Sequence, residues 1–223
     1  IVNPRFQGAD EYRVLPVPYA DARYVDGRGI RLFANVPRGL GGYVLRRRGA
    51  GPRLDVALAI APGFANRERE DVPGLPEFGP AVEGRAYVEL SGRSWGLTAS
   101  FAQALGTGHE GAYADLSANR RWRLGQRGFL SVGPTVRIGD GAYNGALYDV
   151  PERFVASSGL RAHKAGAGVE SLALAGVLSL PVSGPWRITV VGRAGRLLGD
   201  AADSPVVRDE TQLFGLVALT RRF

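Results

Sequence analysis

Few residues in this chain have the types and spacing that catalysis or metal binding requires. The histidines are His109 and His163, which lie on different segments, and neither has a partner at metal-ligand spacing. We therefore expect His109 to be a solvated turn residue and His163 to be an ordinary strand residue. Cysteine is absent, which excludes thiolate metal sites and disulfides.

Acidic and hydroxyl residues near the carboxyl end are the next candidates. Asp200, Asp203 and Ser204 lie close together, but their spacing lacks the ligand count of a calcium loop, and Pro205 fits a turn. The sequence contains neither a Gly-x-Ser-x-Gly elbow nor a phosphate-binding loop. A hydrolytic pair of Ser158 and His163 is the remaining enzymatic alternative. We therefore predict a protein that is not an enzyme and that uses no cofactor or metal.

The charge of the chain is carried by arginine. Lysine and arginine together number 28 against 21 acidic residues, and Lys164 is the single lysine. A basic balance is typical of proteins that bind nucleic acid or an anionic membrane surface. No recognised nucleic-acid motif is present, so we predict no nucleic-acid partner. Arginine also packs well against carboxylates in a confined space, such as the inside of a barrel.

Alternation of apolar and polar residues with period two predicts β-strands. In residues 184–198, for example, Trp186, Ile188 and Val190 fall on one face, whereas Arg187 and Arg193 fall on the other. Turn residues separate about twelve such runs, with ten as the alternative count. The first dozen residues are polar, and we expect them to be loosely held. The twelve predicted strands are 16–26, 28–36, 40–48, 52–61, 81–91, 94–105, 111–124, 127–139, 160–166, 169–182, 185–198 and 210–223.

A soluble β-sandwich and a membrane barrel both alternate, and alternation alone does not separate them. No stretch reaches the roughly 18–20 apolar residues of a transmembrane helix. Two features favour an all-β, antiparallel, up-and-down transmembrane barrel that is a single domain over residues 1–223 and contacts a lipid bilayer. The last strand ends in the aromatic Phe223, as in chains that the outer-membrane assembly machinery reads. An interfacial girdle is the second feature, formed by Trp95, Trp122, Trp186, Tyr43, Tyr87 and Phe223.

In such a barrel the polar faces turn inward, and charges in a narrow lumen are tolerated when they are paired. The sequence therefore predicts an arginine–carboxylate network that closes the lumen. A twelve-stranded barrel could instead leave a small polar pore, which would prefer anions. The candidate lumen charges are Arg85, Arg121, Arg123, Arg187, Arg193, Asp55, Glu89 and Asp115.

Three stretches resemble the MltA-interacting protein (MipA)/OmpV family. These are Gly195–Val207, with its Gly-Asp-Ala-Ala-Asp-Ser-Pro core, the pair Ser158–Leu160 and Ala165–Gly168, and the opening Pro4–Val14 followed by Pro16–Pro18. The resemblance implies an outer-membrane barrel of a Gram-negative bacterium whose signal peptide has been removed. One family member is described as a scaffold that joins a murein-hydrolysing lytic transglycosylase to a murein synthase, and others as porin-like or adhesion proteins. Residues 143–150 depart from the aromatic-rich stretch that the family leads one to expect, which puts a shared partner interface in doubt.

Counting strands backward from a periplasmic Phe223 predicts which loops face which side. The count places 199–209 and 166–168 outward, and 181–185, 140–159 and 62–80 in the periplasm. We expect short helical turns in the two long segments, 62–80 and 140–159, and a docking role for periplasmic murein enzymes. A plug or a cap across the barrel mouth is the alternative for these segments. An anion-preferring channel and an outward-facing adhesin remain alternatives for the whole protein, and the sequence leaves the oligomeric state open. Candidate partner contacts are Asp149, Pro151, Arg153, Phe154, Arg67 and Arg69.

Overall fold

The computed structural model describes residues 1–16, 21–25, 31–35, 38–106 and 108–221. They form one antiparallel sheet of 13 strands with three short α-helices and one 3-10 turn, so the predicted all-β antiparallel class is confirmed. Within the described residues, no helix is long and apolar enough to cross a membrane. The strands are β1 (Val2–Pro4), β2 (Tyr12–Val14), β3 (Asp21–Val25), β4 (Arg31–Asn35), β5 (Gly39–Arg47), β6 (Arg53–Pro62), β7 (Val82–Ser91), β8 (Trp95–Ala104), β9 (Ala112–Leu124), β10 (Gly128–Gly139), β11 (Gly168–Pro181), β12 (Trp186–Leu197) and β13 (Thr211–Arg221), and the helical segments are α1 (Gly141–Tyr148), η1 (Glu152–Phe154), α2 (Val155–Ser158) and α3 (Gly199–Ala202).

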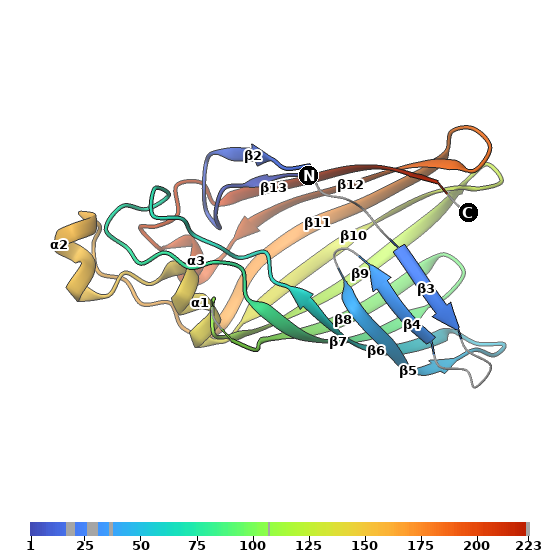
Figure 1. Ribbon diagram of the computed structural model, residues 1–223, viewed down its shortest axis with the longest axis horizontal. Helices are drawn as coiled ribbons and strands as arrows, with labels where there is room; N and C mark the ends of the chain where they lie inside the picture. Colours follow the sequence, from blue (N-terminus) through green and yellow to red (C-terminus); the bar gives the residue numbers. More distant parts are fainter. Residues whose placement is uncertain (17–20, 26–30, 36–37, 107, 222–223) are drawn as a thin grey trace.

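Each strand from β3 to β13 pairs with the next strand along the chain, which is the predicted up-and-down order. The long strands β7 to β13 lie side by side in Figure 1, and β3 and β4 lie at one edge of the sheet. β1 lies between β13 and β2 at the other edge. Among the described residues the sheet is not closed.

Two predictions about the strands are wrong. Residues 160–166 form no strand, and they make only one isolated bridge, between Val150 and His163. Apolar residues in this stretch are instead buried against the loops around them, as Ala165 is. The first dozen residues are not loosely held, because they contain β1, lead into β2 and bury Phe6 and Ala9.

The apolar faces of the strands point away from the inside of the sheet. On β6, Leu58 and Ile60 are 54% and 58% exposed, whereas Ala57 and Ala59 between them are buried. β7 follows the same rule, with Val88 outside and the buried Glu83 inside. A water-soluble sandwich buries its apolar faces, and an exposed apolar band of this extent in water would favour aggregation. One face of the sheet therefore carries exposed apolar side chains, and the other face carries small and charged side chains that are buried.

All the long connections lie at one end of the sheet. The turns 48–52, 92–94, 125–127 and 182–185 share the opposite end with the close of β13, and we call this the short-turn end. Residues 63–81, 140–167 and 198–210 gather at the other end, with α1, α2 and α3 (Figure 1). The prediction that 62–80 and 140–159 face the side opposite to 199–209 is therefore wrong. When the mistaken strand 160–166 is removed, every loop before it is assigned to the opposite end of the sheet.

The three tryptophans lie at the short-turn end and face outward. Trp95 and Trp186 each begin a strand, and Trp122 lies near the end of β9. Two tyrosines predicted for the same girdle are placed differently. Tyr43 and Tyr87 point inward and pack with Phe33 in an internal cluster. Phe223 lies outside the described residues.

Candidate functional site

Three loop segments assemble into a compact body, here called the cap, made of residues 63–81, 140–167 and 198–210. α1 begins after Asp140, whose side chain accepts a hydrogen bond from the Tyr143 backbone N–H and so caps the helix. The helix then buries Tyr143, Leu147 and Tyr148 in one apolar cluster. The partners in this cluster are Ala65, Ala165, Leu197 and Ala201.

A second cluster ties the amino-terminal segment to the cap. Phe6 and Ala9 pack with Val72, Leu75 and Val150 in one buried group. Hydrogen bonds connect the cap segments to one another: Ser204 Oγ donates to the Tyr148 carbonyl at 2.6 Å, and Arg208 donates to the Asp71 carbonyl at 2.7 Å. The three segments therefore pack on one another at one end of the sheet, with helical turns in 140–159 but none in 62–80.

One buried polar network lies where β7 and β9 meet the cap. His109 is fully buried, so its prediction as a solvated residue is wrong. Its Nδ1 accepts the Gly111 backbone N–H, which leaves Nε2 to donate to Glu83 Oε1 at 2.9 Å. The Tyr113 hydroxyl donates to Glu83 Oε2 at 3.0 Å, and the Arg85 guanidinium pairs with the same carboxylate at 2.6 Å. Glu83 is therefore an acceptor at the centre of three donors.

A second network is centred on Arg137 of β10. Its guanidinium holds Asp115 in a two-point ion pair, with Nε–Oδ1 and Nη2–Oδ2 distances of 2.8 and 2.9 Å. It also donates to the Tyr143 hydroxyl at 3.2 Å and lies 3.7 Å from Glu170. The Tyr148 hydroxyl donates to Glu170 at 2.7 Å. Burial raises the pKa of both tyrosines of α1 well above the ordinary value, so these hydroxyls keep their protons and remain donors.

The second network joins β10 and β11 to α1 of the cap, and the first network contacts the cap through the rings of His109 and Tyr143, whose centroids lie 5.0 Å apart. Every strong acceptor is matched to a cation or a hydroxyl donor, which is the arrangement expected for a structural polar core. Across the residues that the structure describes, no group of three or more histidine or acidic side chains is placed to hold a metal ion.

Five of the predicted lumen charges have side-chain partners on the inward faces of the strands, and the other three lie near the short-turn end. Asp55 pairs with Arg46, Glu89 with Arg38, and Asp115 with Arg137, so these three acids lie within ion pairs on inward faces. Arg85 pairs with Glu83, and Arg193 donates to Ser171 Oγ at 3.1 Å. Arg121, Arg123 and Arg187 lie near the short-turn end, where Arg187 donates to Ser179 and to the Arg127 carbonyl.

The predicted partner contacts also differ among themselves. Arg67 is buried, donates to the Pro76 and Leu147 carbonyls and stacks on Phe78, so it stabilises the cap. Asp149 accepts the Ala165 backbone N–H and closes α1. Pro151 precedes η1, and Phe154 is half-buried beneath the Arg153 guanidinium. Arg69 and Arg153 are exposed, and they are the members of this set with charges at the cap surface.

The short-turn end carries a concentration of positive charge, here called the arginine rim. Its members are near strand ends or in turns, and none forms an ion pair with a carboxylate among the described residues. Two acids of this region in the described part of the chain, Asp55 and Glu89, are already paired with Arg46 and Arg38. The positive charges lie close enough to affect one another, because the charge of Arg46 is the main cause of the lowered pKa of Arg48. The rim consists of Arg47, Arg48, Arg53, Arg93, Arg120, Arg121, Arg123, Arg127 and Arg187.

Sequence reasoning missed His109, Glu170 and the two α1 tyrosines as parts of the networks. Glu170 gave a usable signal, because it is a lone carboxylate at the start of an otherwise apolar strand. A buried carboxylate needs partners, and this requirement alone predicts a donor nearby. No such signal exists for His109, because its partner Glu83 lies 26 residues away on a strand that is not its neighbour in sequence.

Comparison with known proteins identifies one family. Neither a curated protein nor a solved structure matches the chain significantly. The family model described as MltA-interacting protein MipA matches residues 1–223, the whole of the sequence, in agreement with the resemblance carried by residues 4–14 and 195–207. The chain belongs to the MltA-interacting protein MipA family.

Proposed function

We propose that the protein is an outer-membrane β-barrel that acts as a scaffold for periplasmic murein-hydrolysing and murein-synthesising enzymes, and that it catalyses no reaction itself. The family name supports a murein hydrolase as one partner. The outward apolar faces of the strands support the membrane setting, because lipid is the solvent that accepts them without cost.

The arginine rim is the surface that we assign to the partners. Barrels of this kind keep short turns on the periplasmic side and long loops outside. By this rule the short-turn end faces the periplasm and the cap faces outward, so the long segments are not the docking surface. The observation that carries the proposal is the rim itself: nine arginines that have no carboxylate partner among the described residues are a surface suited to an acidic protein patch.

Matched charge reversals at the two ends test this assignment. The rim variant is Arg93→Glu with Arg127→Glu, and the cap variant is Arg69→Glu with Arg153→Glu; all four positions are exposed. Binding of purified MltA to the protein in detergent is measured at moderate salt. We expect the rim variant to weaken binding roughly tenfold and the cap variant to weaken it less than twofold. Loss of binding in the cap variant alone, or no binding by the unchanged protein, would contradict the proposal.

An anion-preferring pore is the second candidate, favoured by the inward direction of Arg121, Arg123 and Arg187. Conductance across a planar bilayer decides between the two. A pore predicts current with an anion-selective reversal potential that Arg121→Ser with Arg123→Ser abolishes, whereas a silent protein removes this candidate.

A further inference from the structure

Each of the three tryptophans has an outward-facing arginine beside it at the short-turn end. The register of β8 and β9 places Trp95 opposite Arg120, and Trp122 lies two positions further along β9 on the same face. On β12 and β13, Trp186 lies opposite Arg221, whose guanidinium carbon is 5.9 Å from the centre of the indole ring. Cross-strand partners share a face of the sheet, so tryptophan and arginine are neighbours at both places.

Arg120 interrupts an outward row that is otherwise apolar. Along β9 the same row contains the exposed side chains of Leu116 and Trp122. The neighbours of Arg120 across the sheet are Trp95 of β8 and Val132 of β10. The charge is therefore surrounded by apolar and aromatic side chains on the face of the sheet that the other long apolar residues occupy.

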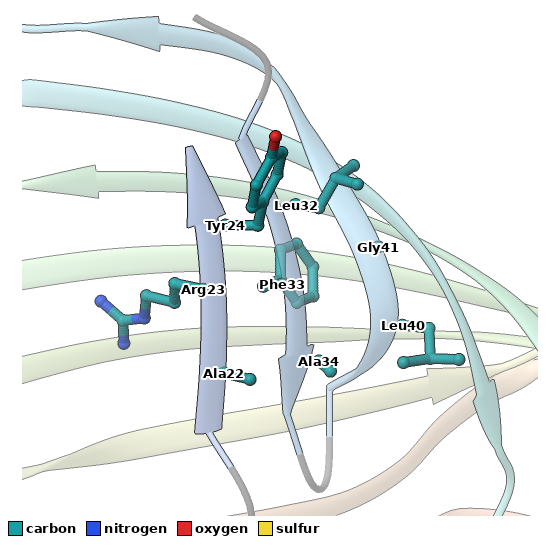
Figure 2. A pocket seen from close by; sticks show the side chains of 8 residues that line it. All are labelled: Ala22, Arg23, Tyr24, Leu32, Phe33, Ala34, Leu40 and Gly41. Atoms are coloured by element: carbon teal, nitrogen blue, oxygen red, sulfur yellow. The ribbon is translucent and has the colours of Figure 1, made fainter. Parts of the chain in front are cut away.

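Outward faces elsewhere in the sheet turn charges away or neutralise them. Over β3, β4 and β5, Tyr24, Leu32 and Leu40 line an open, largely apolar hollow, and Arg23 extends away from β4 (Figure 2). Arg196 does face outward on β12 near the cap, beside Leu172, but the Glu210 carboxylate pairs with it at 2.6 Å.

The polar groups around Arg120 have no partner in the part of the chain that the structure describes. Arg120 is exposed and forms neither a hydrogen bond nor an ion pair with a described residue, and the indole N–H groups of Trp95 and Trp122 donate to none of them. The guanidinium presents its N–H donors in a planar fork that matches phosphate, and each indole adds one donor. We call Trp95, Arg120 and Trp122 the arginine–tryptophan cluster.

The place of this cluster along the strands indicates which anion it meets. β8 begins at Trp95 and β9 ends at Leu124, so the cluster lies near the ends of both strands. An arginine on a lipid-facing strand is strongly unfavourable at the middle of the hydrocarbon and nearly neutral close to the interface. Tryptophan is also enriched at the level of the lipid headgroups. In a bilayer, the anions at that depth are headgroup phosphates.

We propose that the arginine–tryptophan cluster binds the phosphate of an anionic phospholipid in the leaflet at the short-turn end, an inference that rests on the proposed membrane setting. Arg120 pairs with the phosphate, and the indole N–H groups of Trp95 and Trp122 donate to the phosphate or to the ester carbonyls beside it. A zwitterionic headgroup carries its own cation, which competes with Arg120, so the anionic lipid is preferred. The arginines of the turns, such as Arg93 and Arg127, remain the surface for an acidic protein.

Quenching of tryptophan fluorescence by brominated lipids tests the proposal. The full chain with Trp186→Phe keeps Trp95 and Trp122 as its only tryptophans. It is folded into mixed vesicles of phosphatidylglycerol and phosphatidylcholine in which one lipid or the other carries bromine on its acyl chains. At equal mole fraction we expect a roughly fivefold preference for phosphatidylglycerol at these tryptophans. Arg120→Gln should reduce the preference to less than about twofold.

Arg196→Gln is the matched control, because it also removes one outward arginine but one that Glu210 already neutralises. This variant should keep the full preference. Equal quenching by the two lipids, or a preference that persists in Arg120→Gln, overturns the inference while leaving the membrane setting in place. Weaker binding of MltA by Arg120→Gln with unchanged lipid quenching would assign Arg120 to the protein surface and would also overturn it. Absence of quenching by either lipid would overturn the membrane setting and the inference with it.

Discussion

Arg137→Met should destabilise the protein strongly, because it removes the cation at the centre of the second network. The side chain of Arg137 is about one-fifth exposed and makes two hydrogen bonds to Asp115 and one to Tyr143. Methionine fills similar space but leaves Asp115, and beside it the nearly buried Glu170, without their cation. Breaking one partner of a buried ion pair costs about 3–5 kcal/mol. We expect the free energy of unfolding to fall by that amount, which is more than a hundredfold in the equilibrium constant.

Denaturant unfolding of the protein in lipid vesicles, followed by tryptophan fluorescence, measures the change. Arg123→Met is the matched control: the same substitution on the exposed rim should change the free energy by less than about 0.5 kcal/mol. Adding Glu170→Gln to Arg137→Met should recover part of the loss, because it removes one unpaired charge. Equal stability of the Arg137 and Arg123 variants would refute the reasoning that the network holds the sheet to the cap.

Three further predictions concern the cap, the outer surface and the sheet. Phe6→Ala should lower the free energy of unfolding by about 3–5 kcal/mol and speed proteolysis within the cap, because Phe6 is buried in the cluster that ties the amino-terminal segment to it. Leu58→Arg should destabilise the protein in vesicles by about 2–4 kcal/mol, measured by denaturant titration, because an exposed leucine on a lipid-facing strand becomes a charge in hydrocarbon. Gly133→Ala should reduce the yield of folded protein in refolding assays, because an added Cβ would overlap the Ala118 carbonyl oxygen.

The alternation of apolar and polar residues along the sequence predicted the two faces of the strands well. The alternation of Leu58 with Ala57 and Ala59 is visible in the sequence, and the structure places these residues on opposite faces. The inward direction of Asp55, Glu89 and Asp115 followed from the same period of two. These features depend only on neighbours along one strand, where sequence and geometry correspond directly.

The cap could not be predicted in the same way. Leu160 and Ala165 have the apolar character of strand residues, but their contacts come from distant parts of the chain, such as Val72 and Leu197. One mistaken strand at 160–166 then reversed the sidedness of the earlier loops, because each strand changes the end at which the chain lies. The partner of His109 likewise depends on the register of three strands, which no local pattern specifies.

Spin labels at single cysteines test most directly the central claim that the apolar faces meet lipid and the polar faces line the interior. The outward set is Leu58→Cys, Leu174→Cys and Val217→Cys, and the inward set is Ser117→Cys and Ala175→Cys. In vesicles we predict that the outward labels are accessible to oxygen, which dissolves in lipid, and shielded from a water-soluble nickel complex. The inward labels should show low accessibility to oxygen. Nickel access at Leu58→Cys, Leu174→Cys and Val217→Cys equal to that of a label on the exposed cap residue Arg153→Cys would contradict the account.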